Sequence, residues 1–463
     1  MKTCKLFIFL SLIALHSTAK VSLPAVISSG MVLQQQSEVA LWGKAKSSSK
    51  LSIVTSWNKK TYSLTTEKDG SWKTTVQTPT AGGPYGITFN DGEKLELQDV
   101  LIGEVWVCSG QSNMQMPVGG FMNEPVAHSL NLLMEAEEQG VRLFKIERTW
   151  ANTPRTALKA RWKSSNAENI SDFSAVGYQF ARMLQKQLHV PVGIIESAFG
   201  GTPIEAWMKS NSLAGFTDYP VKTDTTTTNR NDASVLFNAM INPIVGFHIK
   251  GVIWYQGESN RSTANTYDRK MQAMVKEWRN IWACGDWPFY YVQIAPFLYK
   301  GDENKLPLMY EAQARAMRLI PNSGMAVSVD AGSEVSIHPS DKTVISQRLA
   351  YWALAKTYGK KGIPYQGPKY KSIQTENGKA IVNFEHTNNG LTAYDKPLIN
   401  FEIAGEDRVF YPGTAIISGS TVVVQSNRVS KPVAVRYAFK DWLAGNLYNV
   451  DGLPAAPFRT DQW

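Results

Sequence analysis

The 463-residue chain has only three cysteines, and no run of apolar residues in it is long enough to cross a membrane. Cys4, Cys108 and Cys284 are too few for a disulfide framework, and their spacing does not match a zinc site. Cys108 ends an apolar run, which predicts a small buried side chain and not a reactive thiol. The fold must therefore be stabilised by its apolar core.

Charge is also sparse. Charged residues make up 19% of the chain, and the net charge of +9 is spread without a dense block of lysine and arginine. Proteins that bind nucleic acid carry clustered basic patches, so we expect no nucleic-acid partner. The hydrophobic fraction of 43% is typical of a globular protein.

The amino terminus has the pattern of a cleaved secretory signal. Lys2 and Lys5 precede an apolar stretch over residues 6–15, and small residues follow at 17–19. This stretch is too short to span a bilayer, so no membrane insertion is expected. The pattern predicts a signal peptide over residues 1–19 and a mature chain exported to the periplasm or secreted.

Three regions follow the predicted signal. Residues 20–98 contain short alternating runs broken by turn residues, which predicts a β-sandwich. Residues 99–361 alternate apolar strands with helical stretches, which is typical of an α/β domain with a mostly parallel sheet covered by helices on both sides. In residues 362–463 short strands return, and we expect a β-rich region packed on the middle domain.

Ser112 lies just beyond the apolar run at residues 102–108. A serine at the tip of a buried strand lies at the carboxyl edge of the sheet, where open α/β sheets place their chemistry. Its hydroxyl is a weak nucleophile unless a base lies beside it and donors stabilise an oxyanion.

His338 is the predicted base. Of six histidines, it alone lies in a loop directly after a core strand and directly before a helix, at the same edge as Ser112. An imidazole exchanges its proton near neutral pH, as a general base must.

Two further strand-end loops offer donors to an oxyanion. The loop at residues 197–202 contains Gly200 and Gly201, and paired glycines let backbone N–H groups approach a ligand. The loop at residues 256–260 ends in Asn260, an uncharged side-chain donor. Serine, glycine, asparagine and histidine thus occupy four separate loops, in that order.

This order, with the sequences around it at residues 103–114, 199–207, 254–260 and 336–339, resembles the sialate O-acetylesterase family of the SGNH hydrolase superfamily. Residues 31–34 and 82–85 are similar to the family's N-terminal β-domain. The resemblance implies an SGNH-hydrolase-like (flavodoxin-like) three-layer α/β/α domain. It also implies a serine esterase that removes O-acetyl groups from carbohydrate, chiefly from sialic acids, with acetylated xylan or another polysaccharide as the alternative substrate.

By position, the resemblance implies Ser112 as nucleophile and His338 as general base and acid. The oxyanion donors would be the N–H groups of Ser112 and Gly201 and the side chain of Asn260, with Gly200 as the competitor of Gly201. No cofactor and no metal ion are implied.

One position departs from the superfamily pattern. Val335 stands where an aspartate often precedes the histidine by three residues. Three candidates for the group that orients His338 remain open: Glu334, Asp330 and a backbone carbonyl near Ser336.

Two other interpretations compete with the esterase. Glu258 and Asp330 both follow strands and would form the carboxylate pair of a glycosidase. A non-catalytic carbohydrate-binding protein would instead use some of the 14 tryptophans, Trp207 above all, to contact sugar. A sialate would need a cation for its carboxylate, and Arg230 and Arg261 are candidates. The sequence gives no indication of oligomeric state.

Overall fold

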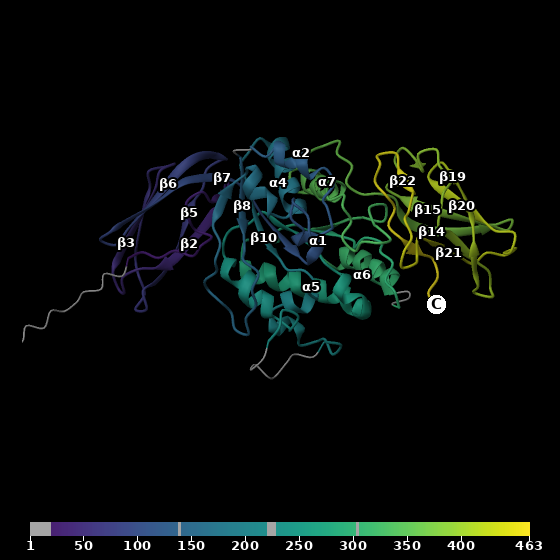
Figure 1. Ribbon diagram of the computed structural model, residues 1–463, viewed down its shortest axis with the longest axis horizontal. Helices are drawn as coiled ribbons and strands as arrows, with labels where there is room; N and C mark the ends of the chain where they lie inside the picture. The colour runs from purple at the N-terminus through teal and green to yellow at the C-terminus, as the bar shows by residue number, and fades with distance from the viewer. Residues whose placement is uncertain (1–19, 138–139, 220–227, 302–304) are drawn as a thin grey trace, which may run out of the picture.

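The computed structural model describes residues 20–137, 140–219, 228–301 and 305–463. The predicted signal at residues 1–19 lies outside this range. The chain is elongated, with β-rich regions at the two ends and the helices in the middle (Figure 1). Over the described residues, none of the helices combines the length and the hydropathy that crossing a bilayer requires.

A mainly parallel sheet forms the middle of the molecule. Its strands lie in the order β13-β12-β11-β7-β10-β8-β9, and all neighbours pair in parallel except β8 and β9. The strands are β7 (Lys94–Gly110), β8 (Val141–Lys145), β9 (Trp162–Ser164), β10 (Val192–Ala198), β11 (Gly251–Tyr255), β12 (Phe289–Val292) and β13 (Ser323–Ala326). The apolar runs of the sequence predicted the positions of these parallel strands.

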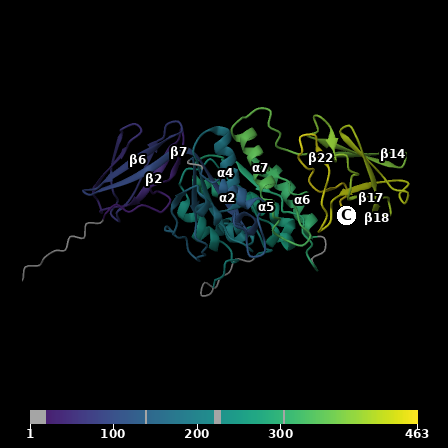
Figure 2. The same cartoon turned by 45° about the horizontal axis from the view of Figure 1, so that its top comes forward.

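Helices pack on this sheet in two pairs. One pair is α4 (Ala175–Leu188) with α7 (Thr343–Trp352), and the other is α5 (Ala264–Trp282) with α6 (Lys305–Leu319). The two pairs lie on opposite sides of the strands in Figure 1, and Figure 2 shows the same helices between the two β-rich ends. Strands β10 and β11 are buried along their whole length, which explains why they are rich in Val and Ile and show no alternation.

The close contact of α4 with β7 requires a glycine. A Cβ atom on Gly177 would lie 2.6 Å from Sγ of Cys108, so any larger residue would push the helix off the sheet. Cys108 is a free, fully buried cysteine, and burial raises its thiol pKa well above the usual value. It is a core side chain, as the sequence predicted.

Strand β7 connects the middle of the molecule to the N-terminal region. Its first part pairs with β6 (Gly82–Asn90) and β1 (Val32–Gln34), and its second part pairs with β10 and β11. The domain boundary expected between residues 98 and 99 therefore falls inside a continuous strand. The remaining N-terminal strands are β2 (Glu38–Lys44), β3 (Lys50–Thr55), β4 (Thr61–Thr65) and β5 (Ser71–Gln77).

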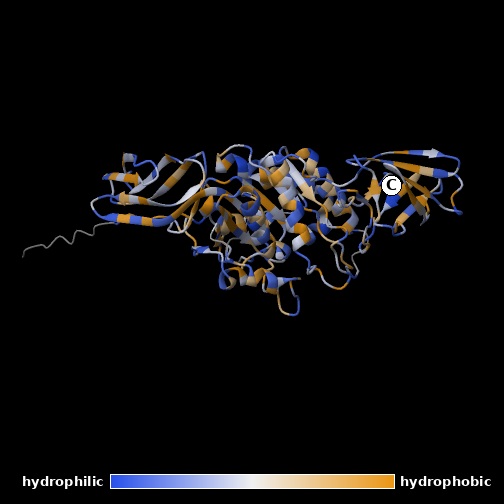
Figure 3. Cartoon of the chain, turned by 90° about the horizontal axis from the view of Figure 1, so that it is seen from above, coloured by the Kyte–Doolittle hydropathy of each residue, from blue (hydrophilic) through white to orange (hydrophobic). Residues whose placement is uncertain are grey.

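The C-terminal region has two four-stranded sheets, β14-β15-β20-β19 and β18-β17-β21-β23, around an apolar core of their own. Orange stretches mark apolar residues along strands at both ends of the molecule in Figure 3. The strands are β14 (Lys369–Glu376), β15 (Lys379–Glu385), β16 (Leu391–Thr392), β17 (Phe401–Ala404), β18 (Phe410–Pro412), β19 (Thr414–Ser418), β20 (Thr421–Gln425), β21 (Ala434–Tyr437), β22 (Tyr448–Asn449) and β23 (Phe458–Arg459).

The strand order sets the place of the site. Strands β10 and β8 lie on one side of β7, and β11, β12 and β13 lie on the other. Connections after neighbouring strands therefore diverge above the end of β7, which leaves a crevice at the carboxyl edge of the sheet. Two short helices, α1 (Ser112–Gln115) and α2 (Ser129–Met134), follow β7. A third, α3 (Ala167–Ser171), follows β9.

The buried carboxyl of Glu196 in β10 makes stability depend on pH. Burial is the main cause that raises its pKa from 4.5 to about 7, and its Oε2 accepts the N–H of Ser174 at 2.8 Å. Between these two values the folded protein holds a proton that the unfolded chain has released, so stability falls as pH rises through that window.

We therefore expect the free energy of unfolding of the parent to fall by up to about 3 kcal/mol between pH 5 and pH 8. Glu196→Gln should remove this fall. Urea denaturation at both pH values measures it. Equal pH dependence of unfolding in the variant and the parent would contradict the assignment.

Candidate active site

Ser112 is placed by a tight turn at the end of β7. Gly110 has a φ of +136°, and a Cβ atom there would lie 2.2 Å from the backbone oxygen of Tyr255. The next residue, Gln111, donates its N–H to the same oxygen at 3.0 Å. This turn starts α1 at Ser112 and leaves the serine at the carboxyl edge of the sheet.

Ser112 opens into a cavity of about 720 Å³, a volume suited to a small ligand. The cavity brings together Ser112, both candidate glycines and His338 from three separate loops. Its lining residues are Gln111, Ser112, Gly200, Gly201, Arg230, Glu258, Ser259, Arg261, Ser262, Lys305, Ile337 and His338.

The carboxylate that orients His338 is Glu124. Its Oε2 lies 2.7 Å from Nδ1 of His338, which leaves Nε2 as the ring nitrogen that can serve the cavity. Glu124 lies in the loop after α1, far from His338 in sequence. It supplies the carboxylate that the chain lacks at position 335. Val335, at the position of the usual acid, is 89% exposed.

Local contacts hold Glu124 in place. The backbone groups of Phe121 and Glu124 bond to each other, with N–H to oxygen distances of 2.9 and 3.0 Å. The Phe121 ring packs edge-on against the His338 ring at 5.3 Å, and Glu124 Oε1 accepts the hydroxyl of Ser336 at 3.4 Å. Sequence reasoning missed Glu124, because an acid in an irregular loop carries no periodic signal.

The candidates expected for this role lie elsewhere. Both carboxylate oxygens of Asp330 bond to Arg348 at 2.7 Å, so this side chain anchors the loop to α7. Glu334 is exposed. Nδ1 of His338 is occupied by Glu124 and not by a carbonyl near Ser336. All three expectations for the orienting group are therefore corrected by the contact with Glu124.

The two glycines of the loop after β10 differ in their backbone contacts. The N–H of Gly200 donates to Oε1 of Gln115 at 2.7 Å, so it is already used. The N–H of Gly201 has no acceptor among the described residues. The Cβ position of Gly200 lies 3.1 Å from Cβ of Ser112, which places this loop directly against the nucleophile candidate.

Asn260 is turned away from the cavity. Its amide nitrogen donates to Oε2 of Glu205 at 2.9 Å and to Oγ1 of Thr263 at 3.3 Å. Its oxygen accepts the N–H of Ile204 at 2.8 Å and the amide of Gln256 at 2.7 Å. The structure therefore does not bring Asn260 together with Ser112 and His338.

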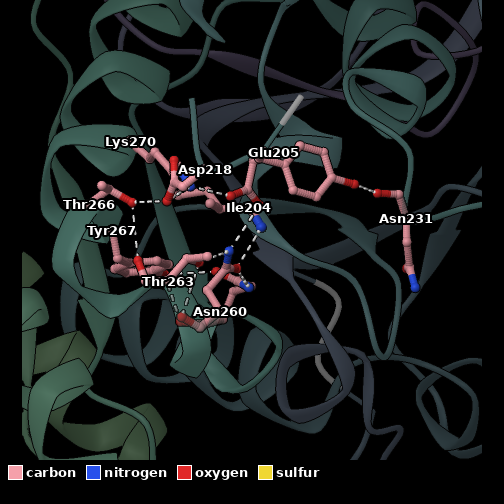
Figure 4. A network of polar contacts seen from close by, with 11 residues as sticks. Ile204, Glu205, Asp218, Asn231, Asn260, Thr263, Thr266, Tyr267 and Lys270 are labelled. Atoms are coloured by element: carbon pink, nitrogen blue, oxygen red, sulfur yellow. Dashed lines mark hydrogen bonds and ion pairs between the residues drawn. The ribbon is translucent and has the colours of Figure 1, made fainter. Parts of the chain in front are cut away.

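A buried ion pair continues this network (Figure 4). Nζ of Lys270 lies 2.6 Å from Oε1 of Glu205 and 2.8 Å from Oδ2 of Asp218, and the side chains of Lys270 and Glu205 are fully buried. Asn260 thus connects the loop after β11 to the segment after β10, and these hydrogen bonds fix the position of one relative to the other.

Gln111 is a cavity residue that sequence reasoning missed. Its Oε1 accepts the N–H groups of Gly257 at 3.3 Å and Ser259 at 3.4 Å, and these contacts fix the orientation of the amide. The amide nitrogen has no acceptor in the part of the chain that the structure describes. Gln111 therefore offers an N–H group at the wall of the cavity, beside Ser112.

Two other candidates are core residues. Trp207 is fully buried, donates to Oγ1 of Thr202 at 3.0 Å and packs edge-on against Trp254, so it is not available to a sugar. Asp330 does not line the cavity that contains Glu258, so the two do not form the carboxylate pair of a glycosidase.

The two arginine candidates also differ. The guanidinium of Arg261 lies 3.2 Å from the centre of the Tyr299 ring, and it donates to the backbone oxygen of Glu258. Nη2 of Arg230 lies 3.5 Å from the Cβ position of Gly201, at the cavity wall. Both arginines line the cavity, and Arg230 is the one beside the glycine loop.

Comparison with known proteins defines the class. Residues 102–353 match the family described as carbohydrate esterase, sialic acid-specific acetylesterase. The sialate O-acetylesterases of Pongo abelii and Homo sapiens are each 30% identical to this chain, over 93% of it and 91% of their own length. The crystal structure of a carbohydrate acetylesterase from Xanthomonas citri superposes with a TM-score of 0.87, at 34% identity, over 96% of this chain and 100% of that one.

The chain is therefore a carboxylic ester hydrolase built on an α/β fold. It belongs to the sialic acid-specific acetylesterase family of carbohydrate esterases.

The contact between Glu124 and His338 predicts a large effect of an isosteric change. Glu124→Gln keeps the size of the side chain but removes the charge that stabilises an imidazolium, so we expect kcat to fall by about 10²–10⁴-fold. Steady-state hydrolysis of an aryl acetate measures it.

Asp330→Asn is the matched control, since it weakens a buried ion pair with Arg348 in the loop that carries His338. It should lower the melting temperature and leave kcat close to that of the parent. If Asp330→Asn and Glu124→Gln lowered kcat equally, Glu124 would not be the orienting carboxylate.

Proposed function

We propose that this protein is a serine esterase that removes O-acetyl groups from carbohydrates, chiefly sialic acids, through an acetyl-serine at Ser112. The observation that carries the proposal is the hydrogen bond between Glu124 and His338, at the wall of the cavity that Ser112 shares. A histidine oriented by a carboxylate, in the same cavity as a serine, is the combination of residues that can activate a hydroxyl for acyl transfer.

The first half of the reaction forms the acyl-enzyme. Oγ of Ser112 attacks the acetyl carbonyl carbon while His338 takes the hydroxyl proton, and Glu124 stabilises the resulting imidazolium. The tetrahedral oxyanion accepts the N–H groups of Ser112 and Gly201. His338 then gives its proton to the leaving sugar oxygen as the ester bond breaks.

The second half releases acetate. Water attacks the acetyl-serine, again with His338 as base, and the same donors stabilise the second oxyanion. Collapse of this intermediate restores the Ser112 hydroxyl. In each half His338 takes one proton and gives it back, and the acetic acid formed in the second half ionises to acetate in solvent.

The third oxyanion donor in this proposal is Gln111, in place of Asn260. The amide nitrogen of Asn260 already donates to Glu205 and Thr263, whereas that of Gln111 has no acceptor among the described residues and lies at the cavity wall. A donor that is fixed in advance and not otherwise used is what stabilises developing charge.

The proposal extends to the organisation of the chain. A signal over residues 1–19 is removed on export to the periplasm or the outside. A β-sandwich over residues 20–98 and a β-rich region over 362–463 flank a three-layer SGNH-type domain over 99–361. The two helix pairs on either side of the central sheet, and the separate C-terminal core, support this division.

Among acetylated sugars, an acidic one is favoured by Arg230. This cation lies beside the glycine loop at the cavity wall, where the carboxylate of a sialic acid bound through its ester would find a partner. A neutral acetylated xylan has no group that requires such a cation.

Acetate release tests the function. The purified protein should release acetate from O-acetylated sialic acid, an organophosphonate should label Ser112, and Ser112→Ala should abolish both. Sugar binding without acetate release or labelling would favour a carbohydrate-binding protein instead. Cleaved glycosidic bonds would favour a glycosidase.

Arg230→Met sharpens the substrate assignment. It should raise KM for O-acetylated sialic acid by about tenfold, the effect of losing one charge-assisted hydrogen bond, and leave KM for acetylated xylan unchanged. Equal effects on the two substrates would remove the preference for an acidic sugar.

A pair of amide variants tests the oxyanion donors. Gln111→Ala should lower kcat by about 10²–10³-fold, as the loss of one donor does, beyond any loss of stability from the two long N–H contacts of 3.3 and 3.4 Å that it gives up. Asn260→Ala should instead lower stability by about 1–3 kcal/mol and keep kcat, because it leaves the buried Oε2 of Glu205 without its donor. Aryl acetate kinetics and urea denaturation of both variants separate these effects, and the reverse pattern would return the donor role to Asn260.

A further inference from the structure

A buried polar cluster lies directly behind the cavity. It consists of Asn113, Glu258 and Lys342, which are 1%, 5% and 1% exposed. Asn113 belongs to α1, Glu258 begins the short helical segment after β11, and Lys342 precedes α7. Three separate segments of the chain therefore meet at this cluster.

Asn113 is the centre of the cluster. Its amide nitrogen donates to Oε1 of Glu258 at 2.7 Å and to the backbone oxygen of Ile337 at 3.0 Å, and its oxygen accepts Nζ of Lys342 at 2.6 Å. Asn113 follows Ser112 in the chain, and Ile337 precedes His338. One side chain thus ties the segment of the nucleophile to the segment of the base.

The cluster also places a carboxylate next to the base. Glu258 lines the cavity with His338, and its Oε2 is buried without a partner among the described residues. The cations facing it are Lys342, across Asn113, and His338. The hydroxyls of Tyr255, Tyr267 and Tyr310 also interact with Glu258. Glu124 and Asp341 act on Lys342, and Arg261 and Lys305 line the same cavity as Glu258.

Such an arrangement is costly for stability. Burial raises the pKa of Glu258 and lowers the pKa of Lys342 to about 7, and each group partly offsets the shift of the other. Apolar residues of similar volume would stabilise a protein at least as well as a buried ion pair. Stability alone therefore does not account for the cluster.

We propose that Asn113, Glu258 and Lys342 are positioning residues that fix the spacing of Ser112 and His338 and hold a negative charge beside the imidazole. The cluster acts on the imidazolium that forms during acyl transfer, in addition to Glu124. Fixed charge aimed at charge that develops in the transition state needs no reorganisation during the reaction. The inference rests on the proposed serine mechanism.

Glu258→Gln is the primary test, because it keeps the shape and removes the charge. We expect kcat for an aryl acetate and for an acetylated sugar to fall by about 10²-fold, with KM changed less than about twofold, since the residue acts on the base and not on substrate. The rate at which an organophosphonate labels Ser112 should fall by a similar factor.

Asp268→Asn is the matched control. This carboxylate forms a 2.8 Å ion pair with Arg315 between α5 and α6, and it lies outside the cavity. The variant should keep the kcat and the labelling rate of the parent. A loss of kcat in Asp268→Asn as large as that in Glu258→Gln would overturn the proposal, since it would show a general response to a lost buried charge.

The double variant Glu258→Gln/Lys342→Met guards against misfolding, because it removes both buried charges together. It should fold, and its kcat should equal that of Glu258→Gln alone within about twofold, as expected for residues that act as one unit. Parental kcat in Glu258→Gln or in the double variant would overturn the inference. If Ser112→Ala kept full activity, the proposed function itself would fail, and the two failures are thereby distinguished.

Discussion

The structure of this active site depends on one hydrogen bond, between Glu124 and His338. It joins the loop after α1 to the loop before α7, two segments separated by 214 residues in sequence. A second contact between the same loops, from the N–H of Ala127 to the oxygen of Ser340 at 2.9 Å, keeps them side by side. Because the imidazole contacts a residue of the loop that follows Ser112, one loop links the positions of Ser112 and His338.

The position of Ser112 depends on β7. The strand is paired with N-terminal strands along its first part and with β10 and β11 along its second part, so its end is held from both sides. This pairing explains why the apolar run before Ser112 was informative in the sequence. A strand buried on both faces has a strong compositional signal, and the residues just beyond its end lie at the crevice.

The same reasoning separates the predictable part of the site from the rest. Ser112, Gly201 and His338 come after predicted strands, and the rule that parallel strands end at one edge was sufficient to bring them together. Glu124 comes after no predicted strand, and only the folded path of an irregular loop brings it to His338. Asn260 does come after a strand, but the direction of its side chain is decided by a buried carboxylate, Glu205, which accepts its amide protons. Periodicity gives the position of a backbone and does not give the partner of an amide.

Two buried carboxylates, Glu205 and Glu258, lie around the loop after β11, and an asparagine donates to each. Asn260 donates to Glu205 in the pair with Lys270, and Asn113 lies between Glu258 and Lys342. Apolar contacts are nearly insensitive to small slides of one segment over another, whereas hydrogen bonds weaken steeply with misalignment. Loops without strand pairing are therefore held in one position by polar networks. Burying these polar groups lowers stability, and the large apolar core can offset that loss. In this fold, catalytic geometry at the sheet edge is maintained by buried polar contacts, and the sheet beneath it is maintained by apolar ones.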